Sequence, residues 1–217
     1  SFAGHVEVLI HRSVWTAFLL IVTTFFFSKW SIFKKILNDK KKLFILFISG
    51  FLIFINWGVW IYAVSVDKII DASFGYFIMP IISVFLGNFF FKEPITKKGK
   101  ISIFLVIISV SYLLIIDFNS IPWVGLIVAL SWSFYNLFRK KINVETDIGL
   151  LIESLYILPF VLVAFYFISI NNYNDFSLSN PSLMPLLILA GPMTLIPLFL
   201  YVKGVELSGL GPSGMVF

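Results

Sequence analysis

Few side chains in this sequence could do chemistry, and most of those that could lie inside long apolar stretches. Glu153 is the only charged residue in the stretch 148–174. Glu7 and His11 are four residues apart at the start of another apolar stretch, so they share a helix face, and Arg12 follows them. A charged side chain at the centre of a membrane span costs about 2.5–3.5 kcal/mol on insertion scales, so each of these groups needs a structural or functional reason.

Two interpretations are open for each charged group. Glu7, His11 and Arg12 are either interfacial charges that snorkel to the outer surface or a charged gate or substrate-anchoring group at the outer mouth. His11 could also carry a proton, because histidine titrates near physiological pH. Glu153 is either paired with one of the basic residues 139–141 or a coupling carboxylate that faces a central cavity.

A second group of candidates is aromatic. Asn56, Trp57 and Trp60 lie deep in one apolar stretch and Trp132 lies in another, although tryptophan normally gathers at the membrane interfaces. Asn56 and Trp60 share a helix face, with Trp57 one position round. If they face inward, they form a cavity for a flat or cationic organic solute. The alternative is ordinary packing between helices.

Sequence patterns of known catalytic sites are absent. HExxH, GxSxG and P-loop motifs do not occur, there is no cysteine, and there are only two histidines. We therefore expect no enzyme activity, no cofactor and no metal site. An intramembrane enzyme that uses His11 or Glu153 is the minor alternative.

The composition is that of a membrane protein. Of the 217 residues, 59% are hydrophobic and 12% are charged, whereas soluble domains are about half apolar and a quarter charged. The mean hydropathy is +1.01. These values exclude a soluble enzyme, a nucleic-acid-binding domain and a disordered chain, and we attribute the net charge of +5 to a basic cytoplasmic face.

The gaps between charges predict an all-α polytopic membrane protein, since a span needs about 20 apolar residues. No stretch shows the alternation of a membrane barrel. The start of an eighth span is expected from Leu207. The seven complete transmembrane helices are predicted at residues 6–28, 43–65, 72–91, 101–117, 121–138, 148–169 and 183–202.

Basic residues alternate from loop to loop. Fourteen of the 16 lysines and arginines fall on one side, so the positive-inside rule makes the loops 29–42, 92–100 and 139–147 cytoplasmic. The protein is therefore expected to be a multi-pass protein of the cell inner membrane. This orientation places Ser1 outside, which suggests a missing first helix.

Weak internal symmetry points to a repeat. Trp60-Ile61-Tyr62 precedes Ala72-Ser73-Phe74-Gly75, and Phe199-Leu200-Tyr201 precedes Ser208-Gly209-Leu210-Gly211, on opposite sides of the membrane. That is the pattern of an inverted-topology repeat, as in many secondary transporters. Four prolines inside spans predict either packing kinks or hinged helices that line a pathway: Pro80, Pro159, Pro192 and Pro197.

Several segments, in order along nearly the whole chain, resemble the RarD-type (chloramphenicol-sensitive-protein) branch of the drug/metabolite transporter superfamily, whose domains are EamA-like. They are His11-Arg12-Ser13-Val14-Trp15, Asn56-Trp57 with Trp60 and Ala63-Val64, Ala72-Ser73-Phe74-Gly75-Tyr76-Phe77-Ile78-Met79-Pro80, Ser133-Phe134-Tyr135 with Arg139-Lys140-Lys141, and Gly149-Leu150-Leu151-Ile152-Glu153. The segment Leu210-Gly211-Pro212-Ser213-Gly214 departs from the family by being richer in glycine and serine.

The resemblance implies a ten-helix transporter of two inverted halves, of which this chain would be a fragment. Residues 1–117 would be the first EamA-like half without its first helix, and residues 118–217 the second half, cut short in its fourth helix. The predicted substrate-binding residues are Asn56, Trp57, Trp60, Tyr76 and Trp132, and the predicted gating or ion-coupling residues are His11, Arg12 and Glu153.

The expected function is secondary active transport by alternating access, with export of small organic metabolites or drugs. The expected partners are the small-molecule substrate, the lipid bilayer and a coupling ion such as a proton. Nucleic acid is excluded, and a homodimer is left open. The alternatives are a channel, or a membrane receptor or scaffold that does not transport.

Overall fold

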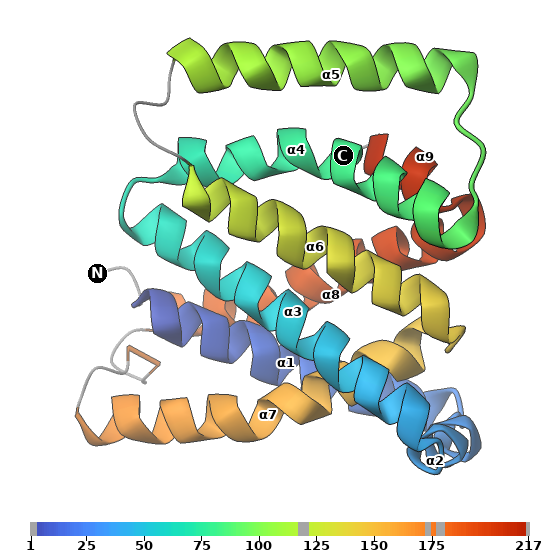
Figure 1. Ribbon diagram of the computed structural model, residues 1–217. Coiled ribbons are helices and arrows are strands. Elements are labelled where there is room, and N and C mark those ends of the chain that lie inside the picture. Colours follow the sequence, from blue (N-terminus) through green and yellow to red (C-terminus); the bar gives the residue numbers. More distant parts are fainter. Residues whose placement is uncertain (1–3, 117–121, 172–174, 177–180, 216–217) are drawn as a thin grey trace.

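The computed structural model describes residues 4–116, 122–171, 175–176 and 181–215, and it is helical outside the connections. The long helices lie side by side, and each reverses the direction of the one before (Figure 1). The helices are α1 His5–Phe26, α2 Trp30–Leu37, α3 Lys40–Ser65, α4 Ile69–Phe91, α5 Lys97–Ile116, α6 Trp123–Ile142, α7 Thr146–Ile170, α8 Leu183–Ser208 and α9 Leu210–Met215.

Six of the helices described are long and apolar enough to cross a membrane: α1, α3, α4, α5, α7 and α8. The prediction of an all-helical polytopic membrane protein is therefore confirmed. The predicted span 121–138 corresponds to α6, which is 20 residues long but more polar than the others, and the seventh span stays a prediction. The buried residues of α6 include Ser131, Ser133 and Asn136. Protein, rather than lipid, surrounds much of this helix, because α3 and α4 pack against it.

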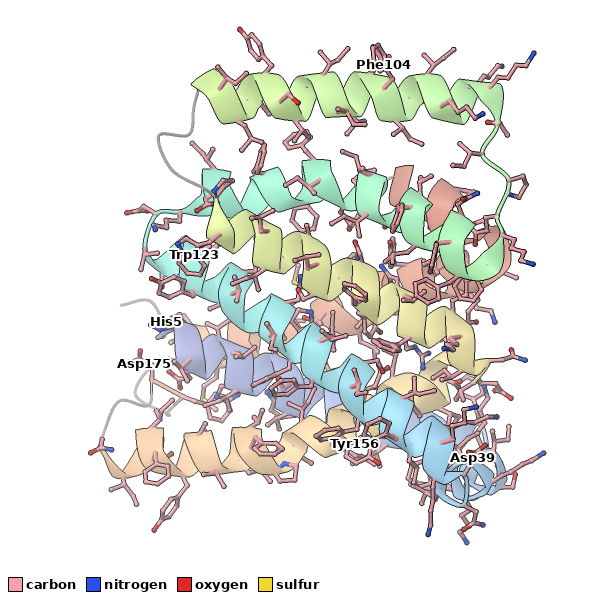
Figure 2. The ribbon with its side chains drawn as sticks, in the orientation of Figure 1. His5, Asp39, Phe104, Trp123, Tyr156 and Asp175 are labelled. Carbon is pink, nitrogen blue, oxygen red and sulfur yellow. The ribbon has the colours of Figure 1, made fainter. Side chains whose placement is uncertain are left out.

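The opposite ends of the bundle carry the residues expected on opposite sides of the membrane. His5, Trp123 and Asp175 lie at one end, and Asp39 lies at the other (Figure 2). We call these the outer end and the inner end, following the orientation that the basic loops predict.

The boundaries at the inner end were predicted wrongly. The expected loop 29–42 contains α2, because Phe33 and Ile36 pack against an apolar cluster while the lysines of this helix point away from it. Helix α5 begins within the expected loop 92–100, at Lys97. The expected loop 139–147 is reduced to residues 143–145, since α6 and α7 extend into it. Charged residues mark where the sequence becomes polar, and a helix can continue beyond that point.

The break before α9 lies three residues later than the sequence suggested. Helix α8 continues to Ser208, and Gly209 then adopts a φ of +99°. Glycine reaches that left-handed region without the steric cost that other residues carry. Helix α9 therefore begins at Leu210 rather than at Leu207.

The helix boundaries do not add support for the predicted inverted repeat or for breaks at the four prolines. Ala72–Gly75 lie inside the first two turns of α4, whereas Ser208–Gly211 span the break between α8 and α9. The two motifs thus occupy different positions relative to their helices, and the inverted repeat stays a prediction. The four prolines lie inside continuous helices: Pro80 in α4, Pro159 in α7, and Pro192 and Pro197 in α8.

Helices α4 and α6 meet at two glycines. A Cβ atom on Gly75 would overlap the carbonyl group of Gly125, and a Cβ atom on Gly125 would overlap the carbonyl group of Asp71. Small residues of this kind let membrane helices approach to backbone contact. This close crossing holds the pocket-lining residues of α4 and α6 near one another.

Helix α5 stands apart from the rest of the bundle and packs against α4 (Figures 1 and 2). Val110 is its only buried residue among those whose side chains are described. Phe104 and Ile115 are 62% and 82% exposed. Apolar exposure on this scale would be a liability in water, but it is ordinary for a helix that faces lipid.

Candidate functional site

A pocket of about 190 Å³ lies inside the bundle, and five helices contribute to its wall. It contains six of the eight residues predicted from the sequence, including all five that were expected to bind substrate. Its lining residues are Arg12 of α1, Asn56, Trp57 and Trp60 of α3, Tyr76 of α4, Trp132 of α6, and Met193, Thr194, Pro197, Leu198 and Tyr201 of α8.

Asn56 joins two walls of the pocket. Its side-chain Nδ2 donates to the carbonyl oxygen of Val128 at 3.0 Å and to Oγ of Ser131 at 3.1 Å. Both partners lie on α6, and Asn56 is buried. An amide inside an apolar bundle is costly unless it is hydrogen-bonded, so this side chain fixes α3 against α6 and sets the shape of the pocket.

Aromatic rings form most of the remaining wall. Trp60 and Tyr76 meet edge to face, with ring centroids 5.5 Å apart, and Trp132 lies 5.3 Å from Tyr201. Asn136 holds Tyr201 by donating to its hydroxyl oxygen at 3.1 Å. Rings in these arrangements are preorganised, since they pack against one another in favourable geometries.

Arg12 is the charged member of the pocket wall. Its guanidinium carbon lies 4.5 Å from the ring centroid of Trp57, which is a cation–π contact. Its Nε atom is buried and has no hydrogen-bond partner among the described residues. The pocket therefore contains both a flat aromatic surface and a positive charge with unused donors.

His11 does not reach this pocket. Its ring packs against Phe165 and Phe176, at centroid distances of 5.9 and 4.5 Å, and its Nε2 atom lies 3.9 Å from Oε1 of Glu7. Glu7 accepts hydrogen bonds from the backbone N–H groups of Asp175 and Phe176, at 2.9–3.1 Å. Glu7 and His11 are 1% and 5% exposed, so the interpretation that they snorkel to water is wrong.

Glu153 belongs to a buried polar network beside the pocket. Ser49 Oγ donates to its Oε1 at 2.6 Å, the Tyr135 hydroxyl donates to its Oε2 at 3.4 Å, and Arg139 Nε lies 3.6 Å from Oε1. Of the two interpretations that the sequence left open, the structure shows the ion pair with the basic segment 139–141. Glu153 also lines a cavity of about 10 Å³ together with Trp57, which links the network to the pocket wall.

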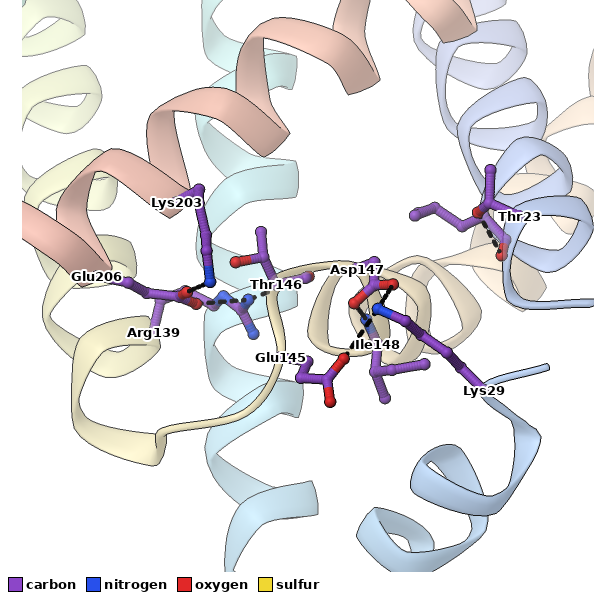
Figure 3. Close-up of polar contacts among 10 residues, drawn as sticks. Thr23, Lys29, Arg139, Glu145, Thr146, Asp147, Ile148, Lys203 and Glu206 are labelled. Atoms are coloured by element: carbon purple, nitrogen blue, oxygen red, sulfur yellow. Dashed lines mark hydrogen bonds and ion pairs between the residues drawn. The ribbon is translucent and has the colours of Figure 1, made fainter. Parts of the chain in front are cut away.

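Arg139 connects this network to the inner end of the bundle. Its Nη2 donates to the carbonyl oxygen of Thr146 at 3.2 Å and lies 3.9 Å from Oε1 of Glu206 (Figure 3). Lys203 also pairs with Glu206, at 3.1 Å (Figure 3). Through these contacts α6, α7 and α8 are tied together by charges.

Glu93 forms a second polar junction at the inner end, which sequence reasoning missed. Its carboxylate pairs with Lys140 and accepts the backbone N–H groups of Leu210 and Gly211 at 3.1 and 3.0 Å. Burial would raise the pKa of Glu93, but the hydrogen bonds from Lys140 and from the two backbone groups outweigh it, so the pKa lies below its ordinary value. A cavity of about 500 Å³ opens beside this junction.

Lys29 anchors the end of α1 to the start of α7. Its ammonium group pairs with Asp147 at 2.6 Å and with Glu145 at 2.9 Å (Figure 3). The hydrogen bond to Asp147 contributes most to raising the pKa of Lys29 above its ordinary value. These two ion pairs hold the inner ends of α1 and α7 together next to the Arg139 network.

The pocket residues from α8 were also missed, although the sequence carried signals for them. Pro197 stood out as a helix breaker, and Tyr201 belonged to the aromatic run of the repeat. Met193, Thr194 and Leu198 resemble ordinary span residues, and only their place on the inward face of α8 distinguishes them. In the described part of the chain, no cluster of three or more acidic or histidine side chains could hold a metal ion.

Apolar helices of membrane length around a polar and aromatic pocket indicate the class of protein, a polytopic membrane transport protein. The EamA-like transporter family matches residues 3–115. The chain belongs to this family, and within it to the RarD type of the drug/metabolite transporter superfamily.

Three relatives illustrate the similarity. "Protein RarD" of Escherichia coli (strain K12) is 35% identical over 208 residues, which are 94% of this chain and 70% of that protein. An "uncharacterized transporter" of Vibrio cholerae serotype O1 is 32% identical over 94% of this chain and 68% of its own length. The "uncharacterized transporter YojE" of Bacillus subtilis (strain 168) is 32% identical, over 92% of this chain and 67% of its own length. No solved structure matches the chain.

Proposed function

We propose that this chain acts in secondary active transport, exporting a small organic metabolite or drug across the inner membrane by alternating access. The observation that carries the proposal is the 190 Å³ pocket, which five helices of an apolar bundle line. The family membership and the names of its relatives as transporters support it. The driving force is an ion gradient or the gradient of the solute itself.

The architecture that goes with this function has seven complete spans and the start of an eighth. In it, α6 is the seventh span, and residues 1–117 and 118–217 form two inverted halves of a ten-helix transporter. The loops 29–42, 92–100 and 139–147 face the cytoplasm, as their lysines favour. The assembly is a monomer or a homodimer.

Alternating access requires that each end of the bundle open separately, and the two ends have separate polar contacts. Glu7 holds the backbone of Asp175 and Phe176 at the outer end. Glu93 holds the backbone at the start of α9 at the inner end. Breaking one set leaves the other intact, which is what a transporter with two gates needs.

In this mechanism Asn56, Trp57, Trp60, Tyr76 and Trp132 bind the solute, and His11, Arg12 and Glu153 serve gating or ion coupling. In this proposal Glu153 couples a proton to helix movement. A proton on its carboxylate would remove the charge that attracts Arg139. The guanidinium of Arg139 would then pair with Glu206 alone. Such an exchange of partners would change how α6, α7 and α8 are held together.

The size of the pocket favours a metabolite over a drug. Pockets for drug-sized ligands measure roughly 300–1,000 Å³, and this one measures about 190 Å³. We therefore expect solutes with a single ring or a short chain.

Solute counterflow tests the proposal. The protein that carries this chain is reconstituted into liposomes loaded with a panel of unlabelled amino acids, organic acids and organic amines, and labelled solute is added outside. Saturable exchange of a solute supports transport. Electrical conductance without saturation would favour a channel, and saturable binding without exchange would favour a receptor.

Matched tryptophan variants connect the flux to the pocket. Trp57→Ala removes a ring from the pocket wall, whereas Trp123→Ala removes a tryptophan at the outer end that lies outside the pocket. We expect the first to raise the half-saturating solute concentration at least tenfold and the second to leave it unchanged. Equal effects of the two substitutions would refute the assignment of this pocket as the solute site.

A further inference from the structure

We propose that the solute bound in this pocket is a small aromatic acid, whose carboxylate pairs with Arg12 and whose ring lies among the tryptophans. The inference rests on the proposed function, because it names the substrate class of the same site. Of the flat or cationic solutes expected from the sequence, it keeps the flat ones and replaces the cation by an anion, because the charge of the pocket wall is positive.

The pocket wall carries one charge, and that charge is positive. Among the eleven described residues that line the pocket, Arg12 alone is ionic. Aromatic rings by themselves would suit a cation. A cationic solute would have to sit beside a guanidinium inside an apolar bundle, where like charges repel strongly because solvent screening is weak. An anionic solute would instead be attracted by the guanidinium, and the weak screening would strengthen that attraction.

The donors of Arg12 are not consumed by the protein. Among the described residues, Arg12 takes part in no ion pair, and its buried Nε lacks a hydrogen-bond partner. The chain has one other arginine, Arg139, which lies near two carboxylates, those of Glu153 and Glu206. The Nε of Arg139 also lacks a hydrogen bond, so the two arginines differ in ion pairing: Arg139 has carboxylates of the protein beside it, and Arg12 has none among the described residues, as expected if the partner of Arg12 is a ligand.

The nearest acidic residue along α1 is already occupied. Glu7 accepts the backbone N–H groups of Asp175 and Phe176 and lies next to His11. It is five residues before Arg12, so it points to a different side of the helix. Glu7 therefore cannot neutralise Arg12 without giving up these contacts.

The orientation of the guanidinium suits a carboxylate. Its central carbon lies over the ring of Trp57, 4.5 Å from the centroid, a contact that uses the charge of the group and none of its N–H donors. Arginine binds a carboxylate through two parallel N–H donors of this planar edge. The contact with Trp57 thus holds the guanidinium at the pocket wall, with N–H donors left for the acid group of the solute.

The rest of the wall suits a ring of modest size. Trp60, Tyr76 and Trp132 present aromatic surface from three helices. The volume of about 190 Å³ equals that of on the order of six water molecules, at about 30 Å³ each. A single aromatic ring with one short acidic arm suits a space of this size.

Three probes of nearly equal shape test the charge preference: phenylacetate, its neutral amide phenylacetamide, and the cation phenethylammonium. Binding to the purified protein in detergent is measured by isothermal titration, and exchange by counterflow in liposomes. We expect phenylacetate to bind about tenfold or more tightly than the amide, as a charge-assisted hydrogen-bonded pair provides, and the amine to bind most weakly.

Variants of the arginine identify the group responsible. Arg12→Gln should reduce the ratio of phenylacetate to phenylacetamide affinity to about one, and Arg12→Lys should keep part of the preference because it keeps the charge. Lys68→Gln is the matched control, since Lys68 is the other basic residue expected at the outer end and does not line the pocket. This control should leave the ratio unchanged.

The outcomes separate this inference from the proposed function. If the unmodified protein exchanges other solutes but prefers the amide or the amine, or if Arg12→Gln keeps the acid preference, the inference is overturned and transport stands. If no solute of the wider panel is exchanged by folded protein, the proposed function fails first. Should Arg12→Gln not fold, the ranking of the three probes and the Arg12→Lys ratio decide the question.

Discussion

The buried pair of Arg139 and Glu153 should dominate the stability of the inner half of the bundle. The two side chains are 1% and 2% exposed, and they bring opposite charges from α6 and α7 within 3.6 Å. Removing one member of a buried pair typically costs about 3–5 kcal/mol, because the remaining charge stays in a poorly solvated site. Here the remaining group keeps some contacts, so we expect about 3 kcal/mol, at the lower end of that range.

The contacts that survive each substitution set this magnitude. In Glu153→Gln, the guanidinium of Arg139 keeps Glu206 at 3.9 Å and the carbonyl of Thr146 at 3.2 Å. In Arg139→Gln, the carboxylate of Glu153 keeps the hydroxyl donor of Ser49 at 2.6 Å. The double variant leaves no uncompensated charge at this pair. The double variant should lose about 2–3 kcal/mol less free energy of unfolding than the two single variants lose together. That difference is in the upper part of the range of interaction energies for contacting residues.

The assay is reversible unfolding in mixed micelles, with the free energy of unfolding measured as the fraction of denaturing detergent increases. Lys203→Gln is the control, because Lys203 is half exposed in its pair with Glu206 and such pairs contribute less than about 1 kcal/mol. Single costs below about 1 kcal/mol, or costs that simply add in the double variant, would refute the reasoning.

Two further outcomes follow from the helix packing and the inner-end junction. Gly75→Ala should lower the free energy of unfolding by about 1–3 kcal/mol, because its Cβ would overlap the carbonyl of Gly125. Gly58→Ala, whose Cβ would meet only a leucine methyl at 3.8 Å, should be neutral or slightly stabilising in the same titration. At the junction, the depressed pKa of Glu93 means that its contribution to stability is fully present above pH 4.5, its ordinary value, and is lost as the pH falls through the lowered pKa. Thermal unfolding of Glu93→Gln should therefore lie below that of the unmodified protein at neutral pH and converge with it in acid, and a gap that does not depend on pH would contradict the assignment.

The long helices could be predicted from the sequence because hydrophobic stretches of membrane length have few alternatives to a helix. The short amphipathic α2 could not, since a lysine-rich segment looks like a loop until Phe33 and Ile36 find an apolar surface to pack against. The limits of α6 were missed for a related reason. Arg139 was read as the first residue of a loop, whereas the carboxylates around it let the helix continue to Ile142.

Much of the candidate site could be predicted because deep amides, charges and tryptophans need partners or a cavity. Six of the eight predicted residues line the pocket, and Arg12 and Asn56 are among them. His11 lies outside the pocket, under Phe165 and Phe176, and a helix face alone does not indicate which neighbour covers a residue. Glu93 was missed because its backbone partners, Leu210 and Gly211, follow the break at Gly209. No pattern in the sequence around Glu93 indicates that this break lies beside it. The functional roles of these residues stay predictions.

The polarity of α6 has a consequence for how the protein is made. A segment that carries Ser131, Asn136 and Arg139 gains less by moving from the insertion channel into lipid than its neighbours do. We expect it to leave the channel by docking onto α3 and α4, which are synthesised earlier and cover it in the finished fold. Defects at the α4–α6 crossing would then appear during biosynthesis, as wrong topology and removal by quality-control proteases. We therefore expect the glycines of that crossing to affect how much folded protein reaches the membrane, before any solute is bound.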